Sequence, residues 1–181
     1  MINMEGFKVL KKKTVYKSEK VQVDTETISL PNGNTVDWDV MVQPDFYCGV
    51  TIVDDKKVLM SKEWRQGPHD FLTQFTVARA PHEGEEENLS ELKRELKEEL
   101  GVTGGQYEKV MRFAQGTRLT GFTIVYLVTD FTLGETHLDE NEIQKIVALP
   151  IKGLYDELSK NHIVTSDTLL IAKLLEERYS L

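Results

Sequence analysis

The stretch KRELKEELGV, residues 93–102, places Glu95, Glu98 and Glu99 within two turns of a predicted helix. Like charges at i,i+4 spacing destabilise a helix by about a few tenths of a kcal/mol per pair. The three basic residues in the stretch offset only part of this repulsion. A divalent cation would reverse its sign, because carboxylate oxygens are ligands that Mg²⁺ and Mn²⁺ prefer. The stretch is therefore either a solvated acidic face or a metal site.

The helix is expected to span about residues 89–100. Asn88 is a good N-cap residue and Gly101 suits the position after the last turn. Four leucines share one arc of roughly 80° and predict the buried face: Leu89, Leu92, Leu96 and Leu100. The glutamates centre roughly 115° away from the leucines, so they border the buried face rather than oppose it.

Strand patterns precede and follow this helix. Asn32-Gly33 between two alternating runs predicts a hairpin in the first forty residues. A second hairpin is expected from residues 46–65, and residues 71–80 read as one further strand. Two helical patterns close the chain. The helices are too few to alternate regularly with strands, so the fold class is expected to be α+β, with a mixed sheet between helices.

Composition excludes several function classes. The chain has 181 residues, 40% of them hydrophobic, which suits one globular domain with a small N-terminal addition. A net charge of -8 argues against nucleic acid as a partner. No apolar stretch approaches the ~18 residues of a membrane span, so no membrane partner is expected. The single cysteine, Cys48, allows no intrachain disulfide and fits a cytoplasmic location.

The residues around the helix resemble a known family signature. Glu86, seven residues, Arg94-Glu95-Leu96, one residue, Glu98-Glu99, one residue and Gly101-Val102 reproduce most of the Nudix box. The C-terminal part of this pattern is highly specific. The chain is therefore identified as resembling the Nudix hydrolases. That resemblance implies an α/β/α sandwich that hydrolyses a nucleoside diphosphate linked to another group.

The resemblance also implies roles for the residues that match the box. Glu95, Glu98 and Glu99 are similar to ligands of Mg²⁺ (or Mn²⁺), and Arg94 to the partner that orients a neighbouring glutamate. Glu86 corresponds to a residue that supports the loop before the helix. The physical logic agrees, because a bound metal neutralises a diphosphate and lowers the pKa of a bound water.

Two further segments are similar to the ADP-ribose pyrophosphatase branch of the family. The acidic loop before residue 143 resembles a loop that supplies the catalytic base or an additional ligand, and Glu140 and Glu142 are the matching positions. An ordinary solvated loop is the alternative. Trp64-Arg65-Gln66 resembles a segment whose arginine meets substrate phosphates, although an ordinary surface arginine fits as well.

The chain departs from the family pattern before the helix. The first glycine of the box is replaced by Ala80 or, with one residue inserted, by Arg79. In the family this segment offers a backbone carbonyl to the metal and passes close to the diphosphate, where glycine is favoured. A carbonyl of Ala78, Arg79 or Ala80 could still serve as a ligand, and Arg79 is a further candidate for substrate binding. The branch's proline beyond the box is also missing, so ADP-ribose is one candidate among several nucleotide sugars and related dinucleotides.

These observations predict residues 1–44 as a β extension that supports a homodimer and residues 45–181 as a Nudix hydrolase domain. The expected activity is hydrolysis of ADP-ribose or a similar nucleotide sugar to a nucleoside monophosphate and a sugar phosphate. The alternative is a Nudix-fold protein with weak or lost catalysis that binds a nucleotide as a sensor. Retention of all three box glutamates favours the enzyme, and the missing glycine favours the binding protein.

Overall fold

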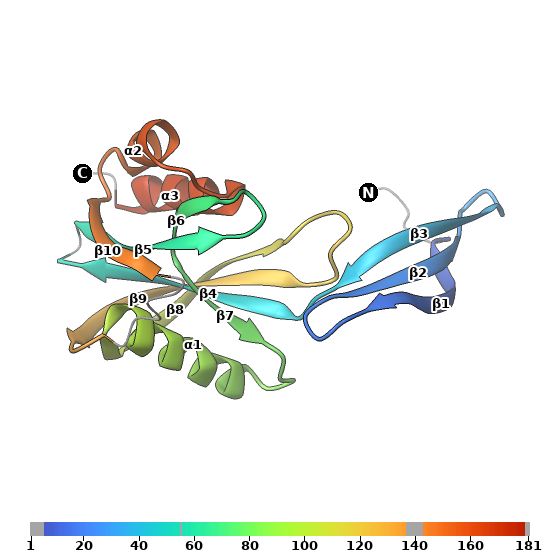
Figure 1. Cartoon of the computed structure of the whole chain (residues 1–181), viewed down its shortest axis with the longest axis horizontal. Helices are drawn as coiled ribbons and strands as arrows, with labels where there is room; N and C mark the ends of the chain where they lie inside the picture. The colour runs from blue at the N-terminus through green and yellow to red at the C-terminus, as the bar shows by residue number, and fades with distance from the viewer. Residues whose placement is uncertain (1–5, 55, 137–142, 180–181) are drawn as a thin grey trace. The chain divides into compact units, whose positions relative to one another are not determined.

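The computed structural model describes residues 6–54, 56–136 and 143–179 (Figure 1). Its elements follow one another along the chain as β1 (Lys8–Lys17), β2 (Gln22–Ser29), β3 (Thr35–Val42), β4 (Asp45–Val53), β5 (Lys57–Arg65), β6 (Asp70–Gln74), β7 (Thr76–Ala80), α1 (Glu85–Leu100), β8 (Val102–Ala114), β9 (Phe122–Leu133), β10 (Ile143–Pro150), α2 (Leu154–Asn161) and α3 (Ser166–Arg178). Backbone contacts divide the chain into two compact units. Unit 1 comprises Met1–Asp45 and Arg112–Thr123, and unit 2 comprises Phe46–Met111 and Ile124–Leu181.

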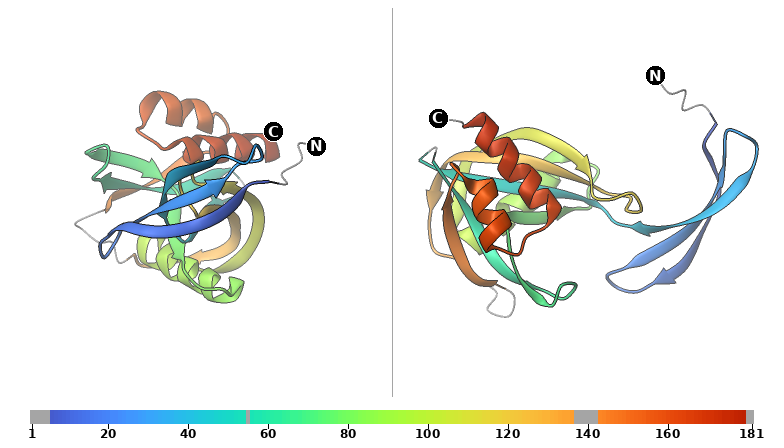
Figure 2. Two further views of the ribbon diagram at one scale, coloured as in Figure 1. Left: turned by 90° about the vertical axis from the view of Figure 1, so that its right-hand side faces the viewer. Right: turned by 90° about the horizontal axis from the view of Figure 1, so that it is seen from above.

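Unit 1 contains an antiparallel sheet of three strands in the order β1-β2-β3, curved along its length (Figure 2). The hairpin predicted at Asn32-Gly33 joins β2 to β3, and Gly33 has the positive φ of 84° that glycine tolerates. All ten residues of β1 are exposed. The middle strand is better covered, and its buried Asp24 pairs with Lys12 at 3.1 Å.

The second segment of unit 1, residues 112–123, is tied to the end of β3. The Met41 amide donates to the carbonyl of Arg118 at 2.8 Å, and the Thr120 hydroxyl bonds to the backbone of Gln43. This segment connects β8 to β9. Unit 1 therefore includes part of the chain that lies far beyond the predicted boundary after residue 44.

Unit 2 has a sheet between helices. Its main path is β10-β5-β4-β9-β8, with β6 added to β5 and β7 added to β4. Helix α1 covers one side of this sheet, and α2 and α3 cover the other (Figures 1 and 2). The predicted α+β fold class, with helices on both sides of the sheet, is confirmed.

Helix α1 packs closely on the sheet through the predicted leucine face. Leu92, Leu96 and Leu100 are buried. A Cβ placed on Gly49 of β4 would lie 3.0 Å from Leu96 Cδ1, so the absence of a side chain at Gly49 lets helix and strand approach. The helix ends as predicted at Gly101, whose φ of 69° is left-handed.

The predicted start of α1 is wrong. The helix begins at Glu85, with Gly84 as its N-cap, about one turn earlier than expected. Asn88 is buried inside the first turns, and its carboxamide accepts from the amide of His82 and donates to the His82 carbonyl, both at 2.9 Å. A tertiary contact thus uses the side chain that local reasoning assigned to capping.

The single strand predicted over residues 71–80 is two strands. Strand β6 pairs with β5, β7 pairs with β4, and Phe75 lies between them. Phe75 is 1% exposed, so its apolar side chain continues the hydrophobic pattern across the break. The division matters for the site, because Gln74 ends a strand that pairs with β5, whereas Thr76 begins a strand that pairs with β4.

Two further observations concern partners and chemistry. None of the helices in the described ranges is long and apolar enough to cross a membrane. The one cysteine, Cys48, is 2% exposed in β4, and burial raises the pKa of its thiol. A buried thiol of this kind packs as a small apolar side chain and is a poor nucleophile.

Candidate active site on helix α1 and strand β5

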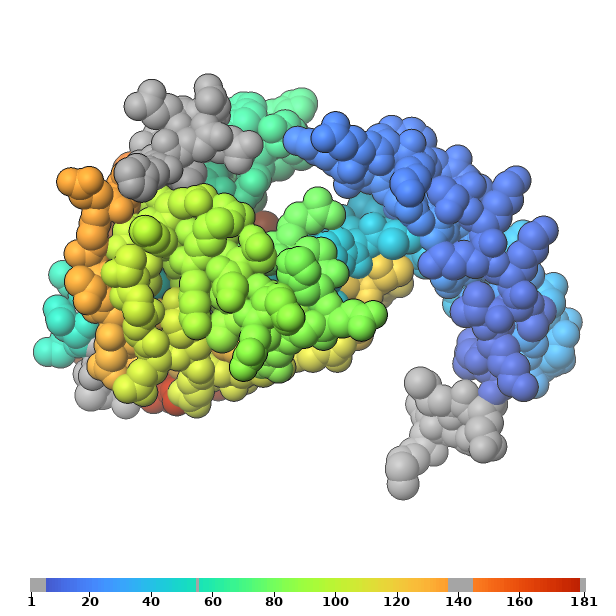
Figure 3. Space-filling model, turned by 90° about the horizontal axis from the view of Figure 1, so that it is seen from below, coloured from blue at the N-terminus to red at the C-terminus, as the bar shows by residue number. Residues whose placement is uncertain are grey.

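Arg94 links three glutamates on the outer face of α1. Its guanidinium donates to Glu91 at 3.3 Å, to Glu95 at 2.5 Å and to Glu98 at 2.8 Å. The helix forms part of the surface of unit 2 (Figure 3). The arginine therefore neutralises part of the carboxylate repulsion along the helix, and it holds Glu95 and Glu98 on the same side.

Glu99 has a different environment from the other two box glutamates. Its Oε2 atom is buried and has no hydrogen-bond partner among the described residues. Burial, and secondly the nearby charge of Glu63, raise the pKa of the Glu99 carboxyl to about 8. The buried hydroxyl of Thr76 acts in the opposite direction and lowers this pKa, although no hydrogen bond of standard geometry joins it to Glu99. At this buried position the Glu99 carboxyl is either protonated or, when ionised, in need of a nearby cation.

Glu63 on β5 is the centre of a network that sequence analysis missed. It is buried, and its carboxylate accepts hydrogen bonds from Ser61, from Arg65 at 2.6 Å and from Gln74 at 3.1 Å. Arg65 also donates through Nε to Gln74 at 3.1 Å. The only signal in the sequence is the two-residue spacing of Ser61, Glu63 and Arg65, which places them on one face of a strand.

The donor chemistry of this region fits a divalent metal ion. Within the described ranges, no three or more His, Cys, Asp or Glu side chains are already close enough to hold a metal. The best indication is the unpartnered Glu99 oxygen, because a buried carboxylate oxygen without a donor favours a cation. Glu95 and Glu98 offer further oxygens, because the hydrogen bonds from Arg94 use only Glu95 Oε1 and Glu98 Oε2. Hard oxygen ligands of this kind suit Mg²⁺ or Mn²⁺.

The segment that replaces the glycine of the box ends strand β7. Ala80 is buried and Arg79 is exposed, in keeping with the alternation along the strand. The following loop is held by the two hydrogen bonds between Asn88 and the backbone of His82. Ala80 and Arg79 thus point to opposite faces of β7, and the loop after them is anchored to α1.

The first turn of α1 is tied to the sheet through Glu85. The Tyr126 hydroxyl donates to Glu85 at 2.7 Å, and Lys109 lies 3.3 Å away. These contacts lower the pKa of the Glu85 carboxyl, with the Tyr126 hydrogen bond as the largest cause. Glu86 is exposed, and no hydrogen bond or ion pair of its carboxylate is found among the described residues.

Glu140 and Glu142, the predicted candidates for the base, lie outside the described residues. The strand that follows them in sequence is described. Its first residue, Ile143, pairs with Glu63 across the β10–β5 ladder. The chain after the acidic loop therefore resumes beside the Glu63 network.

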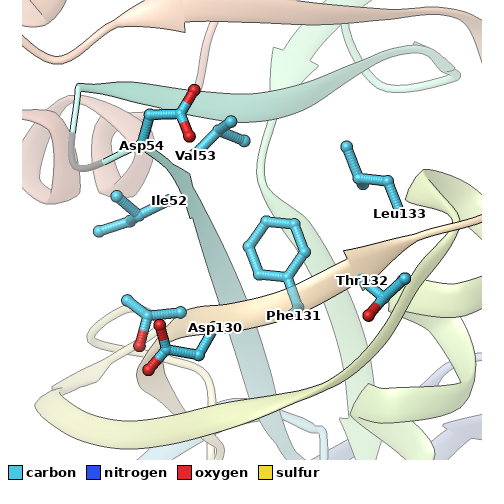
Figure 4. A pocket seen from close by; sticks show the side chains of 8 residues that line it. Ile52, Val53, Asp54, Asp130, Phe131, Thr132 and Leu133 are labelled. Atoms are coloured by element: carbon cyan, nitrogen blue, oxygen red, sulfur yellow. The ribbon is translucent and has the colours of Figure 1, made fainter.

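A separate cavity of about 500 Å³ lies at the ends of β4 and β9 (Figure 4). Its described lining combines apolar and acidic side chains, namely Ile52, Val53, Asp54, Thr129, Asp130, Phe131, Thr132 and Leu133. None of the predicted site residues is among them. The cavity is therefore not the candidate site built from α1 and β5.

Comparison with known proteins supports the fold. No family model matches the chain. A solved structure described as an ADP compounds hydrolase superposes with a TM-score of 0.81 at 20% identity, covering 96% of this chain and 94% of that one. A curated protein, the methanol dehydrogenase activator of Bacillus methanolicus, is 22% identical over 172 residues, which are 93% of this chain and 92% of the activator. The fold is Nudix-like, as the sequence predicted.

Proposed function

We propose that the protein is a metal-dependent hydrolase of a nucleoside diphosphate linked to another group. ADP-ribose or a similar nucleotide sugar would give a nucleoside monophosphate and a sugar phosphate. The observation that carries this proposal is the buried, unpartnered oxygen of Glu99 beside two further glutamates on the same helix. The similarity in fold to an ADP compounds hydrolase supports it.

Each residue of the site has a proposed task. Glu95, Glu98 and Glu99 would hold Mg²⁺ or Mn²⁺, with the carbonyl of Ala80 as a further ligand. The bound ion would supply charge neutralisation at the diphosphate and a bound water of lowered pKa. Arg94 orients Glu95 and Glu98, as its hydrogen bonds indicate. Glu86 would support the loop.

The remaining tasks concern the substrate and the proton. Arg65 and Arg79 would bind phosphate oxygens, because a guanidinium matches phosphate geometry. Glu140 or Glu142 would accept the proton of the attacking water, since a base near the bound water is required. This assignment matches the position of β10, which resumes at Glu63 directly after the acidic loop.

The test is turnover of a panel of ADP-ribose, other nucleotide sugars, dinucleoside polyphosphates and nucleoside triphosphates with Mg²⁺ or Mn²⁺. Glu98→Gln should reduce turnover at least about 100-fold, the upper end of what outer-shell partners of a metal cost. Glu91→Gln is the matched control, because it also removes a carboxylate bonded to Arg94 but occupies a variable position of the box. Equal activity of wild type and Glu98→Gln would refute the proposed metal site.

A second candidate function is suggested by the curated relative. Its name describes an activator of methanol dehydrogenase, and the similarity extends over nearly the whole of both chains. The protein would then act on a dehydrogenase or on its bound nucleotide, with weak catalysis of its own. Adding the protein to NAD-dependent alcohol dehydrogenases and following NADH formation tests this. Stimulation that survives Glu98→Gln would favour a binding role over hydrolysis.

We also propose that the protein is a cytoplasmic homodimer formed through unit 1. Strand β1 is exposed at all ten positions and lies at the edge of its sheet. Several large apolar side chains of unit 1 have about half of their surface exposed, including Phe7 just before β1, Val9 and Leu10 at the start of β1 and Trp38 on β3. Such an edge favours pairing with a second copy. The lone, buried Cys48 suits a reducing compartment.

A further inference from the structure

The guanidinium of Arg65 is held along one edge. Its Nη2 donates to Glu63 Oε2 at 2.6 Å, and its Nε donates to Gln74 Oε1 at 3.1 Å. Glu63 and Gln74 are themselves joined by a 3.1 Å hydrogen bond. The three side chains therefore form a closed ring of hydrogen bonds between β5 and β6.

The other edge of the guanidinium remains available. No hydrogen bond of Nη1 is found among the described residues, and the Arg65 side chain is 39% exposed while that of Glu63 is 3% exposed. A guanidinium carries five N–H donors in a planar fork, so an edge with Nη1 and the second proton of Nη2 can still meet two oxygens of an anion.

The face of β5 that carries this ring is the face of the candidate site. Ser61, Glu63 and Arg65 alternate along the strand and share one side. The charge of Glu63 acts on Glu99, and so does that of Arg65, which places both groups near the helix carboxylates. The free edge of Arg65 is thus a fixed positive group beside a cluster of acids.

We propose that Glu63 and Gln74 are positioning residues that fix Arg65 as a preformed binding group for one phosphate of a nucleoside diphosphate. This inference rests on the proposed function, since it concerns the substrate of the same site. Arginine loses much side-chain freedom when it binds an anion, and a guanidinium already held in place loses less. Glu63 also keeps the arginine from pairing with the helix glutamates.

An opposite role for Glu63 is physically possible and makes the inference testable. A carboxylate bonded to Arg65 cancels part of its positive charge and repels phosphate. If this effect dominated, removal of the charge would strengthen binding of an anion. If positioning dominates, removal weakens it.

The test is a double-mutant cycle on ADP binding, measured by titration calorimetry with Mg²⁺ present. Arg65→Gln should weaken binding about tenfold, the equivalent of one good charge-assisted contact. Glu63→Gln should weaken it about threefold to tenfold. The double variant should bind no worse than Arg65→Gln alone if Glu63 acts on ADP through the arginine rather than through its charge on Glu99. Inorganic pyrophosphate, a probe without base or sugar, should show the same pattern.

Controls separate this role from a general loss of structure. Arg118→Gln removes the same charge from an exposed side chain of unit 1 and should leave ADP affinity unchanged. If the buried Glu63→Gln variant fails to fold, Gln74→Ala at a half-buried position replaces it in the same cycle. Additive losses, tighter binding of Glu63→Gln, or no ADP binding by the wild type would each overturn the inference. If the ADP affinities of the variants follow the expected pattern but no compound is hydrolysed, only the proposed hydrolase activity is refuted.

Discussion

Glu99 is the residue at which stability and function oppose each other. Its carboxyl has a pKa of about 8 because it is buried and lies near Glu63. In the metal-free protein it therefore carries a proton at neutral pH, whereas the unfolded chain would ionise it near its ordinary value. The folded state binds more protons than the unfolded state between these two pKa values, so the free energy of unfolding falls as pH rises through that window.

Replacement of Glu99 by glutamine should remove this pH dependence. The wild type in EDTA should lose stability relative to Glu99→Gln between pH 5 and pH 8, with a slope of at most about 1.4 kcal/mol per pH unit. Urea unfolding at several pH values measures the difference. Parallel stability profiles of the two proteins would contradict the raised pKa.

A metal ion at this site should release a proton. A cation near Glu99 favours the ionised form and lowers its pKa, so Mg²⁺ binding at pH 7 should displace close to one proton per ion. Calorimetric titrations in two buffers of different ionisation enthalpy measure this number. Glu99→Gln should release none, and Mg²⁺ binding by the wild type without proton release would contradict the proposed ligand.

At the scale of the elements, the contact between α1 and β4 should be intolerant of added volume. A Cβ at Gly49 would approach Leu96 to 3.0 Å, so Gly49→Val should shift the helix and cost about 1–3 kcal/mol. Gly67→Val is the matched control, because nothing lies within 4 Å of its added Cβ. Urea unfolding of both variants checks the prediction, and equal stability would show that α1 moves freely on the sheet.

The loop before α1 should depend on Asn88. Asn88→Ala removes both part-buried hydrogen bonds to the backbone of His82, at a cost of about 1–3 kcal/mol for two bonds of about 0.5–1.5 kcal/mol each. Asn161→Ala, at an exposed helix end, should cost much less. Thermal unfolding compares the two. A larger loss of turnover than of stability in Asn88→Ala would further support a role of the loop in the site.

Elements with a local signal were predictable from sequence. Gly101 ends α1 because a left-handed residue is needed there, and Gly33 marks the first hairpin for the same reason. The start of α1 was not predictable, since Asn88 has a partner that depends on the tertiary structure. The break at Phe75 was hidden as well, because a buried aromatic continues a strand pattern.

The candidate site shows the same limit. The box glutamates stand out because three acids occupy one short helix segment. Glu63 and Gln74 carry no such signal, since the hydrogen bond that joins them runs between two strands, and Ser61 and Glu63 share only the two-residue spacing of one strand face. The tie between helix and sheet through Glu85 carries no such signal either, because its partner Tyr126 lies 41 residues further along the chain. Non-local pairing is thus what sequence patterns leave out.

At the scale of the whole molecule, the apolar surface of unit 1 predicts association. Trp38→Lys should convert a dimer to a monomer of 20.7 kDa, because it places a charge within the proposed interface. Leu170→Lys on α3 is the matched control, since Leu170 and Trp38 are both 46% exposed. Light scattering coupled to gel filtration measures the mass. A monomeric wild type, or a dimer unaffected by Trp38→Lys, would contradict this interface.

The same overall architecture is compatible with both proposed functions. The hydrolase structure and the activator each align with more than nine tenths of this chain, at 20% and 22% identity. At such identities the fold is shared while the chemistry can differ, so individual residues must distinguish the hydrolase from the activator. Glu98 and Glu99 separate hydrolysis from binding more directly than any global comparison.

The buried cysteine of β4 has a practical consequence. Because Cys48 is 2% exposed and is the only cysteine in the chain, the native protein offers almost no background in thiol labelling. A cysteine introduced at an exposed lysine, such as Lys13 in unit 1 or Lys173 in unit 2, would be the single fast-reacting position. Pairs of such positions would let spin or fluorescent labels follow both units of one molecule during nucleotide binding, without removal of a native residue.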